Sequence, residues 1–261
     1  MDRSGDHPCL TRPGYFPECA LTAHSEAMRW ASGAHSRVLL PTRSERNEAC
    51  RPMVFDGLVM VSRDGRNWQL GTTREVDWIV NGTTEGPSIT VAIPPVFEAY
   101  ATLYEPDGVA ILTHEQAVVN RLVQFTPAQP WWLGYLETGA HNVVFDDAPR
   151  VSLYWDWPYV LVAAGPEQAL SWRTGHIRAE YGVLPDLFFP QDRSWLVSAL
   201  WDDTWTCVGG PRILIEALHY DPLVQAHRVQ LGVDAKPPGR DRDDETPTEA
   251  NPRMPQWYRD T

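Results

Sequence analysis

Residues 194–218, SWLVSALWDDTWTCVGGPRILIEAL, constrain the fold more than any other stretch of the chain. Two apolar runs of strand length, 194–200 and 204–208, stand on either side of Asp202-Asp203. Short apolar runs separated by a tight polar turn are typical of antiparallel strand pairs. The stretch therefore predicts a β-hairpin with an acidic turn.

A helix is expected directly after this hairpin, over residues 211–219. Gly209-Gly210 lets the backbone reverse, and Pro211 suits the first position of a helix because that position needs no N–H donor. Apolar residues then recur at helical spacing as far as Leu218. One face of the helix is thus apolar and should pack back on the hairpin.

The rest of the core repeats the pattern of short strands joined by turns. Asp64-Gly65 lies between strand-like runs at 58–62 and 68–72, and a further strand is expected at 76–80. Additional strand-like runs occupy residues 131–136, 143–145, 151–155 and 159–163. The connections are mostly shorter than the dozen or more residues that a parallel crossover requires, so the sheet is expected to be mainly antiparallel.

Three further helices should cover this sheet. Residues 95–104 should form one, since two prolines precede aromatic residues at helical spacing. Thr113 and Gln116 match a capping box that begins a second helix over 114–125. A third, short helix is expected at 166–173.

The expected organisation is one α+β domain at residues 53–233, with a mainly antiparallel sheet, packed helices and disordered extensions at both ends. Residues 1–52 are rich in Pro, Arg and Ser and show weak periodicity. They are expected to be either a disordered extension or translated sequence upstream of a true start at Met53 or Met60. The tail, 234–261, is polar and proline-rich, which is typical of disordered segments.

Charge is unevenly distributed along the chain. Residues 53–233 carry ten arginines against 21 acidic residues, which accounts for nearly all of the formal net charge of −12. An acidic surface repels phosphate backbones and anionic lipid surfaces, because both are bound through Lys and Arg. We therefore expect neither nucleic acid nor a membrane as a partner, and a basic protein is favoured.

Several classes of chemistry lack the residues that they need. Lys236 is the only lysine, so the core has neither a Schiff-base lysine nor a P-loop lysine. The cysteines and histidines lack the spacing of a metal site, and we expect no metal and no organic cofactor. No apolar run reaches the roughly 18 to 20 residues of a membrane span, and the N-terminus has no secretory pattern, so a soluble, cytoplasmic protein is expected.

Three stretches resemble a set of uncharacterised bacterial proteins from high-GC genomes: AIPPVFEAYATL, QPWWLGYLETG and DRSWLVSALWDDTWTCVGG. The resemblance covers about residues 70–233 and implies a discrete domain. The order of the predicted elements is also similar to that of SMI1/KNR4-type immunity domains, with a helix led in by prolines, then antiparallel strands and a closing helix. This second resemblance implies a protein-binding role.

Asp202 and Asp203 are the first candidates for catalysis. Adjacent carboxylates can hold a divalent cation or act as acid and base, and His219 on the following helix would complete a hydrolase site. A solvated hairpin turn explains the same two carboxylates without any chemistry. Asp146-Asp147 has the same two interpretations.

Tryptophan is the remaining unusual feature, because ten of the twelve lie in residues 68–205. Neighbours along a strand point to opposite faces, so some of the paired tryptophans should be exposed unless both faces of the sheet are covered. The candidates for an exposed binding surface are Trp131, Trp132, Trp155, Trp157, Trp201 and Trp205. The expected function is therefore a non-catalytic, immunity-like or interaction domain that binds a basic protein, and the alternative is a hydrolase that uses Asp202 and Asp203.

Overall fold

The computed structural model describes residues 52–55, 58–126, 129–137, 144–145, 148–173, 182–200 and 204–237. The predicted extensions at 1–52 and 234–261 lie almost entirely outside these residues. Residues 234–237 are described, and Ala235 is buried with its N–H bonded to the carbonyl of Pro87 at 3.0 Å. The packed domain therefore continues past the expected boundary at residue 233.

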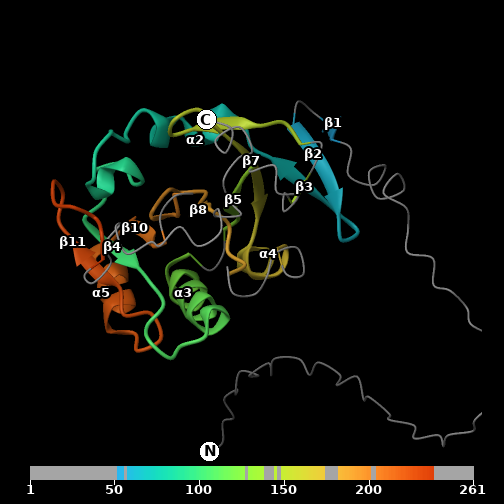
Figure 1. The fold of residues 1–261 in the computed structure, drawn as a ribbon. Helices are drawn as coiled ribbons and strands as arrows, with labels where there is room; N and C mark the ends of the chain where they lie inside the picture. The colour runs from blue at the N-terminus through green and yellow to red at the C-terminus, as the bar shows by residue number, and fades with distance from the viewer. Residues whose placement is uncertain are drawn as a thin grey trace, which may run out of the picture. The chain divides into compact units, whose positions relative to one another are not determined.

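The described chain forms one eleven-stranded sheet in which every neighbouring pair of strands is antiparallel (Figure 1). The strands run in the order β1-β2-β3-β7-β5-β8-β9-β10-β4-β11, and β6 pairs with β7 beside this path. Their bounds are β1 Met53–Phe55, β2 Leu58–Arg63, β3 Arg66–Leu70, β4 Ala99–Leu103, β5 Trp131–Leu136, β6 Val151–Leu153, β7 Trp157–Ala164, β8 Leu187–Pro190, β9 Leu196–Ser198, β10 Thr206–Gly210 and β11 His227–Val229.

Among the described residues, four α-helices and one 3-10 turn pack on this sheet, which confirms the predicted α+β class. They are α2 Thr73–Val80, α3 Ile111–Phe125, α4 Pro166–Ser171, α5 Arg212–Tyr220 and the 3-10 turn η1 Ile89–Val91. Helices α3, α4 and α5 match the predictions at 114–125, 166–173 and 211–219 to within three residues at each end. No helix in the described ranges is long and apolar enough to cross a membrane.

Both faces of the sheet are covered by a hydrophobic cluster. Along β5, Trp131 and Leu133 lie in one cluster and Trp132 and Leu136 in the other, as the alternation of side chains in a strand requires. The first cluster includes residues of α3, α4 and α5, and we call it the helical side. The second includes residues of α2, η1 and the irregular connection from η1 to β4, and we call it the loop side.

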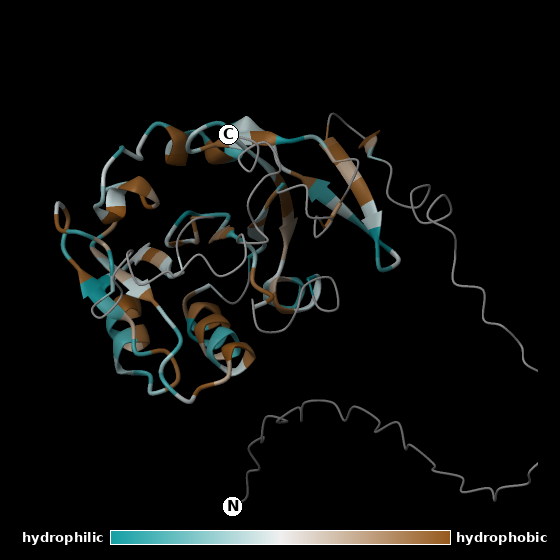
Figure 2. Ribbon diagram, viewed as in Figure 1, coloured by the Kyte–Doolittle hydropathy of each residue, from teal (hydrophilic) through white to brown (hydrophobic). Residues whose placement is uncertain are grey.

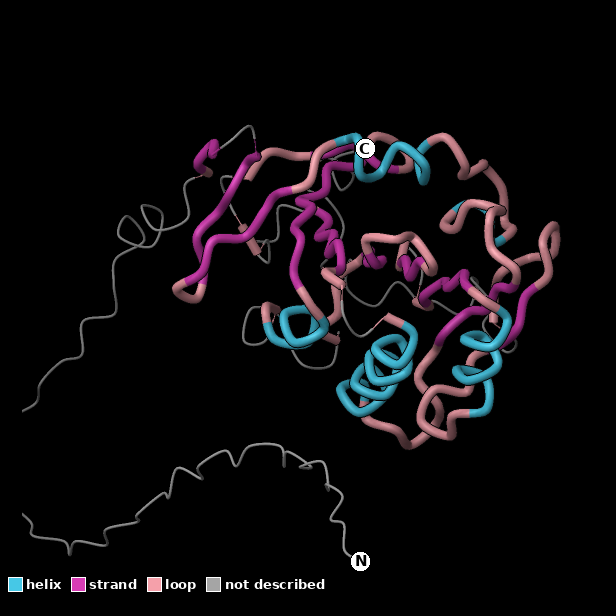
Figure 3. Tube along the Cα trace, turned by 180° about the vertical axis from the view of Figure 1, so that it is seen from behind, coloured by secondary structure: helices cyan, strands magenta, loops and turns pink. Residues whose placement is uncertain are grey.

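The two sides differ in how they are covered. In Figure 3 the connection from α2 to β4 is drawn mostly as loop, whereas α3 and α5 are regular helices that lie next to each other. Figure 2 shows hydrophobic and hydrophilic residues alternating around α3, as expected for a helix with one buried face.

Two hairpins were correctly predicted. Strands β2 and β3 pair in the register Met60↔Gln69, and they are joined by a turn in which Asp64 and Gly65 both have positive φ, at 54° and 70°. Positive φ at both central residues is typical of the tight hairpin turn that the Asp-Gly pair predicts. Strands β9 and β10 pair in the register Val197↔Val208, which confirms the second hairpin.

The predicted helix at 95–104 is wrong, because the chain forms strand β4 there. Tyr100 packs on the loop side and Ala101 on the helical side, so both faces of the strand are buried. A short apolar run that is buried on both faces carries no alternation, and periodicity alone does not distinguish it from a helix. Pairing with β10 and β11 decides the outcome.

The predicted strand at 76–80 is also wrong, because these residues belong to helix α2. The carboxylate of Glu75 accepts hydrogen bonds from both the N–H and the hydroxyl of Thr72, at 2.7 Å each, at the start of this helix. Val76 and Ile79, three residues apart, then share the face that is buried on the loop side. Of the predicted strand 143–145, the described residues 144 and 145 are not in a strand.

Two local predictions about helix starts are also wrong. Helix α3 begins at Ile111, so Thr113 already lies inside it and caps nothing. The pair Gly209-Gly210 does not reverse the chain but ends strand β10. A Cβ at Gly209 would stand 2.5 Å from a ring carbon of Phe97, so the glycine is needed because the connection before β4 crosses close over the strand.

Candidate functional site

The turn between β6 and β7 holds the most exposed tryptophan of the described residues. Its residues Tyr154 and Asp156 both have positive φ, at 54° and 60°, although neither is glycine. Aspartate tolerates this conformation, but at Tyr154 it costs about 1–3 kcal/mol and persists only where the surroundings hold the residue in place. Trp155 stands between them and is 46% exposed.

Tyr154 anchors this turn in the loop side. Its hydroxyl donates to the carbonyl of Ala92 at 3.1 Å and lies 2.6 Å from the hydroxyl of Ser198, which is fully buried. Burial raises the pKa of the Tyr154 hydroxyl, so the group stays protonated and keeps its donor. The Tyr154 end of the turn is therefore fixed to Ala92, which directly follows η1, and to strand β9.

Trp157 supports the turn from the other end. It is 6% exposed, and its ring lies 4.9 Å from that of Trp155 at an angle of 45°. Trp155 therefore rests on a buried ring while part of its own surface faces solvent. An aromatic side chain held in this way loses little conformational freedom when a partner covers it.

The turn and the segment that covers the loop side are both acidic. Asp156 is exposed, and the segment 72–98, which covers much of the loop side, carries four acidic residues against one arginine. Of these acids, Asp77, Glu85 and Glu98 are exposed. The turn thus combines an exposed indole with negative charge.

The other tryptophans predicted for a binding surface do not join Trp155 there. Trp131, Trp132, Trp157 and Trp205 are between 0% and 8% exposed. Both faces of the sheet are covered at these positions, so their rings fill the two hydrophobic clusters and are not available to a partner. Trp201 lies outside the described residues.

The predicted catalytic residues are not brought together by the part of the chain that the structure describes. Asp202 and Asp203 lie outside it, as do Asp146 and Asp147. His219 lies on α5, where its Nδ1 is 2.7 Å from the carbonyl oxygen of Ala226. This contact explains the histidine as a link between α5 and the chain that leads into β11.

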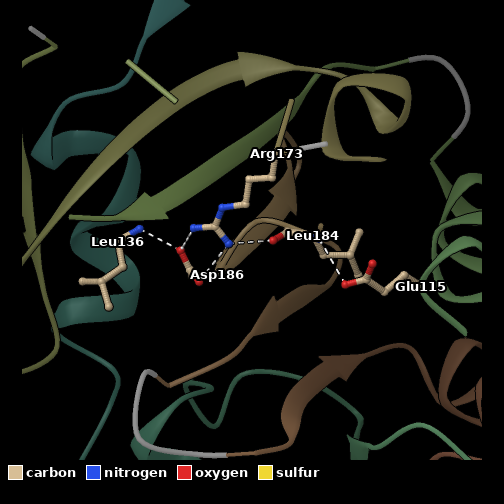
Figure 4. A network of polar contacts seen from close by, with 5 residues as sticks. All are labelled: Glu115, Leu136, Arg173, Leu184 and Asp186. Atoms are coloured by element: carbon tan, nitrogen blue, oxygen red, sulfur yellow. Dashed lines mark hydrogen bonds and ion pairs between the residues drawn. The ribbon is translucent and has the colours of Figure 1, made fainter. Parts of the chain in front are cut away.

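A buried ion pair forms the second notable polar site (Figure 4). Arg173 and Asp186 are 3% and 5% exposed and pair through the two terminal guanidinium nitrogens of Arg173. Asp186 also accepts the N–H of Leu136 at 2.8 Å, and Arg173 donates to the carbonyl of Leu184 at 2.8 Å. Burial by itself lowers the pKa of Arg173, but the charge and the hydrogen bonds of Asp186, together with Tyr135 and Glu115, outweigh it, so the pKa is raised and the guanidinium remains charged.

Glu115 of α3 extends this site. Its carboxylate accepts the N–H of Val183 at 2.8 Å. It also accepts the N–H of Leu184 at 3.2 Å (Figure 4). Gly182 has a φ of 75°, and a Cβ there would stand 2.2 Å from Glu115 Oε1. Together these contacts join α3, the chain just after α4, β5 and the entry to β8, so the site has the form of a structural clasp.

Sequence reasoning found neither Tyr154 as an anchor nor this clasp. In the sequence, the turn is marked only by YWDW between two apolar runs, without a glycine. Positive φ at a tyrosine has no sequence signature, so the anchor could not be predicted. Arg173, Asp186 and Glu115 are isolated charges in sequence and meet only through the fold. Within the described ranges, no group of three or more His, Cys, Asp or Glu side chains could hold a metal ion.

No protein-family model matches the chain, and neither a curated protein nor a solved structure shows significant similarity to it.

Proposed function

We propose that this protein is a non-catalytic protein-binding domain, and that a basic protein docks on the turn at Trp155. The observation that carries the proposal is the exposure of Trp155 in a turn whose two flanking residues are held at positive φ. Strained backbone that is maintained by a buried anchor is more often found at functional positions than elsewhere.

The physical chemistry of interfaces supports this choice of residue. Tryptophan is among the residues that contribute most to binding, because it buries a large area with few rotatable bonds. Here the anchor of Tyr154 and the ring of Trp157 already restrict Trp155, so little entropy remains to be lost on binding.

The charge of the domain supports a basic partner. Residues 53–233 carry about twice as many acidic residues as arginines, and the cover of the loop side is acidic. Such a field speeds up association with a positively charged protein at low salt and discriminates against acidic ones.

The experiment compares two variants of the full chain, Trp155→Ala and Tyr220→Ala, as baits in the native host. Tyr220 is 74% exposed and lies on α5, so it is the matched control for removal of an exposed aromatic ring. We expect a basic partner that is captured by the wild type and by Tyr220→Ala, with binding about 30-fold weaker for Trp155→Ala, which corresponds to a loss of about 2 kcal/mol.

The captured protein is then purified and its association rate is measured against salt concentration. The rate should fall as salt rises, because exposed charges are screened beyond about 10 Å at 0.1 M salt. Equal capture by Trp155→Ala and the wild type would contradict the proposal. Turnover in a panel of hydrolase substrates that is lost in Asp203→Asn would favour the hydrolase alternative instead.

A further inference from the structure

We infer that the turn at Trp155 binds an arginine side chain of its partner, with the guanidinium stacked on the indole and paired with Asp156. This inference rests on the proposed function and specifies which chemical group is recognised. It follows from how arginines and aromatic rings are arranged in the rest of the domain.

Arginine lies over aromatic rings repeatedly in this protein. The guanidinium carbons stand 5.0–5.6 Å from the ring centroids in five contacts, a distance at which the cation is attracted by the negative face of the ring. The pairs are Arg63 with Phe145 and Trp172, Arg173 with Tyr135, Arg193 with Trp78, and Arg228 with Tyr220. Within the described residues, no arginine lies over Trp155, which is 46% exposed.

The carboxylate of the next residue, Asp156, is also accessible to a cation. Asp156 is exposed and forms no ion pair with any described residue. In contrast, Asp221 and Asp186 each pair with an arginine of the domain. An indole face and an unneutralised carboxylate on consecutive residues of one anchored turn are the two groups that a guanidinium uses at once.

Arginine fits this pair better than lysine does. The guanidinium is planar, so it stacks on a ring while its edge N–H groups donate to a carboxylate, and it is more weakly hydrated than an ammonium group. Lysine has a compact, strongly hydrated charge that cannot stack in this way. A neutral side chain of the same shape as arginine has neither the cation–π attraction nor the ion pair.

The test uses full-length protein labelled with ¹⁵N in the tryptophan indoles, in which the resonance of Trp155 is assigned as the one lost in Trp155→Phe. Three peptides are titrated: Gly-Arg-Gly, Gly-Lys-Gly and Gly-citrulline-Gly, each blocked at both ends. We expect the Trp155 resonance to shift saturably with the arginine peptide, about fivefold more weakly with the lysine peptide, and not with the citrulline peptide.

Two variants show whether Asp156 takes part. Asp156→Asn keeps the shape and tolerates positive φ as aspartate does, so the turn should be preserved. It should weaken binding of the arginine peptide about fivefold, because it replaces an ion pair by a neutral hydrogen bond. Glu167→Gln, which removes an exposed carboxylate on α4, should leave the affinity unchanged.

Equal affinities for the arginine and lysine peptides, or a shift with citrulline as large as that with arginine, would overturn the inference. An unmoved Trp155 resonance would overturn it as well. The proposed function fails separately: if Trp155→Ala abolishes capture of the partner while the arginine peptide has no effect, the binding role stands and only the arginine specificity is lost.

Discussion

The helical side and the loop side of the sheet bury polar groups in different ways. On the helical side, helices satisfy their own backbone, and the buried polar groups include the charged side chains of Arg173, Asp186 and Glu115 besides the hydroxyl of Thr126. On the loop side, the buried polar contacts are made by hydroxyl groups: that of Tyr154 donates to the carbonyl of Ala92 and lies 2.6 Å from the hydroxyl of Ser198.

This difference explains how the indole of Trp155 is held outward. A regular helix places its side chains at fixed spacing, so one face of it covers the sheet, although single side chains such as Tyr220 on α5 are exposed. A turn held by side-chain hydrogen bonds can instead adopt positive φ and turn a ring outward, as the chain does at Trp155. Loops positioned by a rigid scaffold are also where binding residues are concentrated.

The largest effect is expected on the helical side, from Asp186→Ala. The variant leaves the guanidinium of Arg173 buried without its counter-charge, which should lower the free energy of unfolding by about 3–5 kcal/mol. Urea denaturation measures this loss. Glu137→Ala is the control, because it breaks a pair with Arg150 whose side chains are 29% and 25% exposed, and it should cost about 1 kcal/mol or less.

Replacing both Arg173 and Asp186 shows whether the isolated charge is the cause of the lost stability. Arg173→Met combined with Asp186→Leu removes the isolated charge, so part of the lost stability should return. If Asp186→Ala costs no more than Glu137→Ala, the buried pair is not the main polar contribution to the helical side, and the contrast between the two sides is weakened.

A smaller effect is expected on the loop side, from Gly209→Ala. The added methyl group would meet the ring of Phe97 at 2.5 Å and a methyl of Ile93 at 2.6 Å, so the connection must shift at a cost of about 1–3 kcal/mol. In Phe97→Ala the ring is absent, and the cost of the double variant should be less than the sum of the two single costs. Thermal unfolding of the wild type, the two single variants and the double variant gives a double-mutant cycle. Strictly additive costs would show that the contact with Phe97 does not cause the loss of stability in Gly209→Ala.

The smallest effect is the pH dependence that His114 contributes to the helical side. Burial lowers the pKa of His114 below its ordinary value of 6.5, partly offset by its hydrogen bond with the carbonyl of Leu223 and by the charges of Glu105 and Asp221. The unfolded chain therefore binds a proton that the folded chain resists. The stability that this histidine contributes is present above pH 6.5 and is lost as the pH falls below it, by at most about 1.4 kcal/mol per pH unit.

The check is the free energy of unfolding of wild type and His114→Gln between pH 7.5 and pH 5, a range of about 2.5 units across the ordinary pKa of histidine. The wild type should lose more stability than the variant over that range. His227→Gln, at an exposed position of β11, serves as the control and should behave as the wild type does. Parallel curves for wild type and His114→Gln would contradict the assignment.

Elements that depend on residues close together in the sequence were predicted correctly, whereas elements that depend on distant contacts were not. The Asp64-Gly65 hairpin and helices α3 and α5 were predicted because turn chemistry and one-sided apolar spacing are encoded within a few residues. Strand β4 was predicted as a helix because its apolar run is buried on both faces. Strands β1, β8 and β11 were not predicted, since each has only three or four residues and leaves little local pattern.

The candidate site, too, was predicted only in part from the sequence. Composition alone indicated an acidic, tryptophan-rich domain, and Trp155 was among the six tryptophans considered for binding. Only the structure separated Trp155 from Trp131, Trp132, Trp157 and Trp205, because exposure depends on what covers each face of the sheet.

The sequence by itself determined the α+β class, the antiparallel character of the sheet and the negative charge of the domain, since these depend on local patterns and on sums over residues. Tertiary structure alone decided the order of the strands, the buried pair of Arg173 with Asp186, and the outward orientation of Trp155. Each of these depends on contacts between residues far apart in the chain, such as Tyr154 with Ala92, and no local pattern encodes them. Such contacts form only when the whole chain has buried its apolar surface on both sides of the sheet.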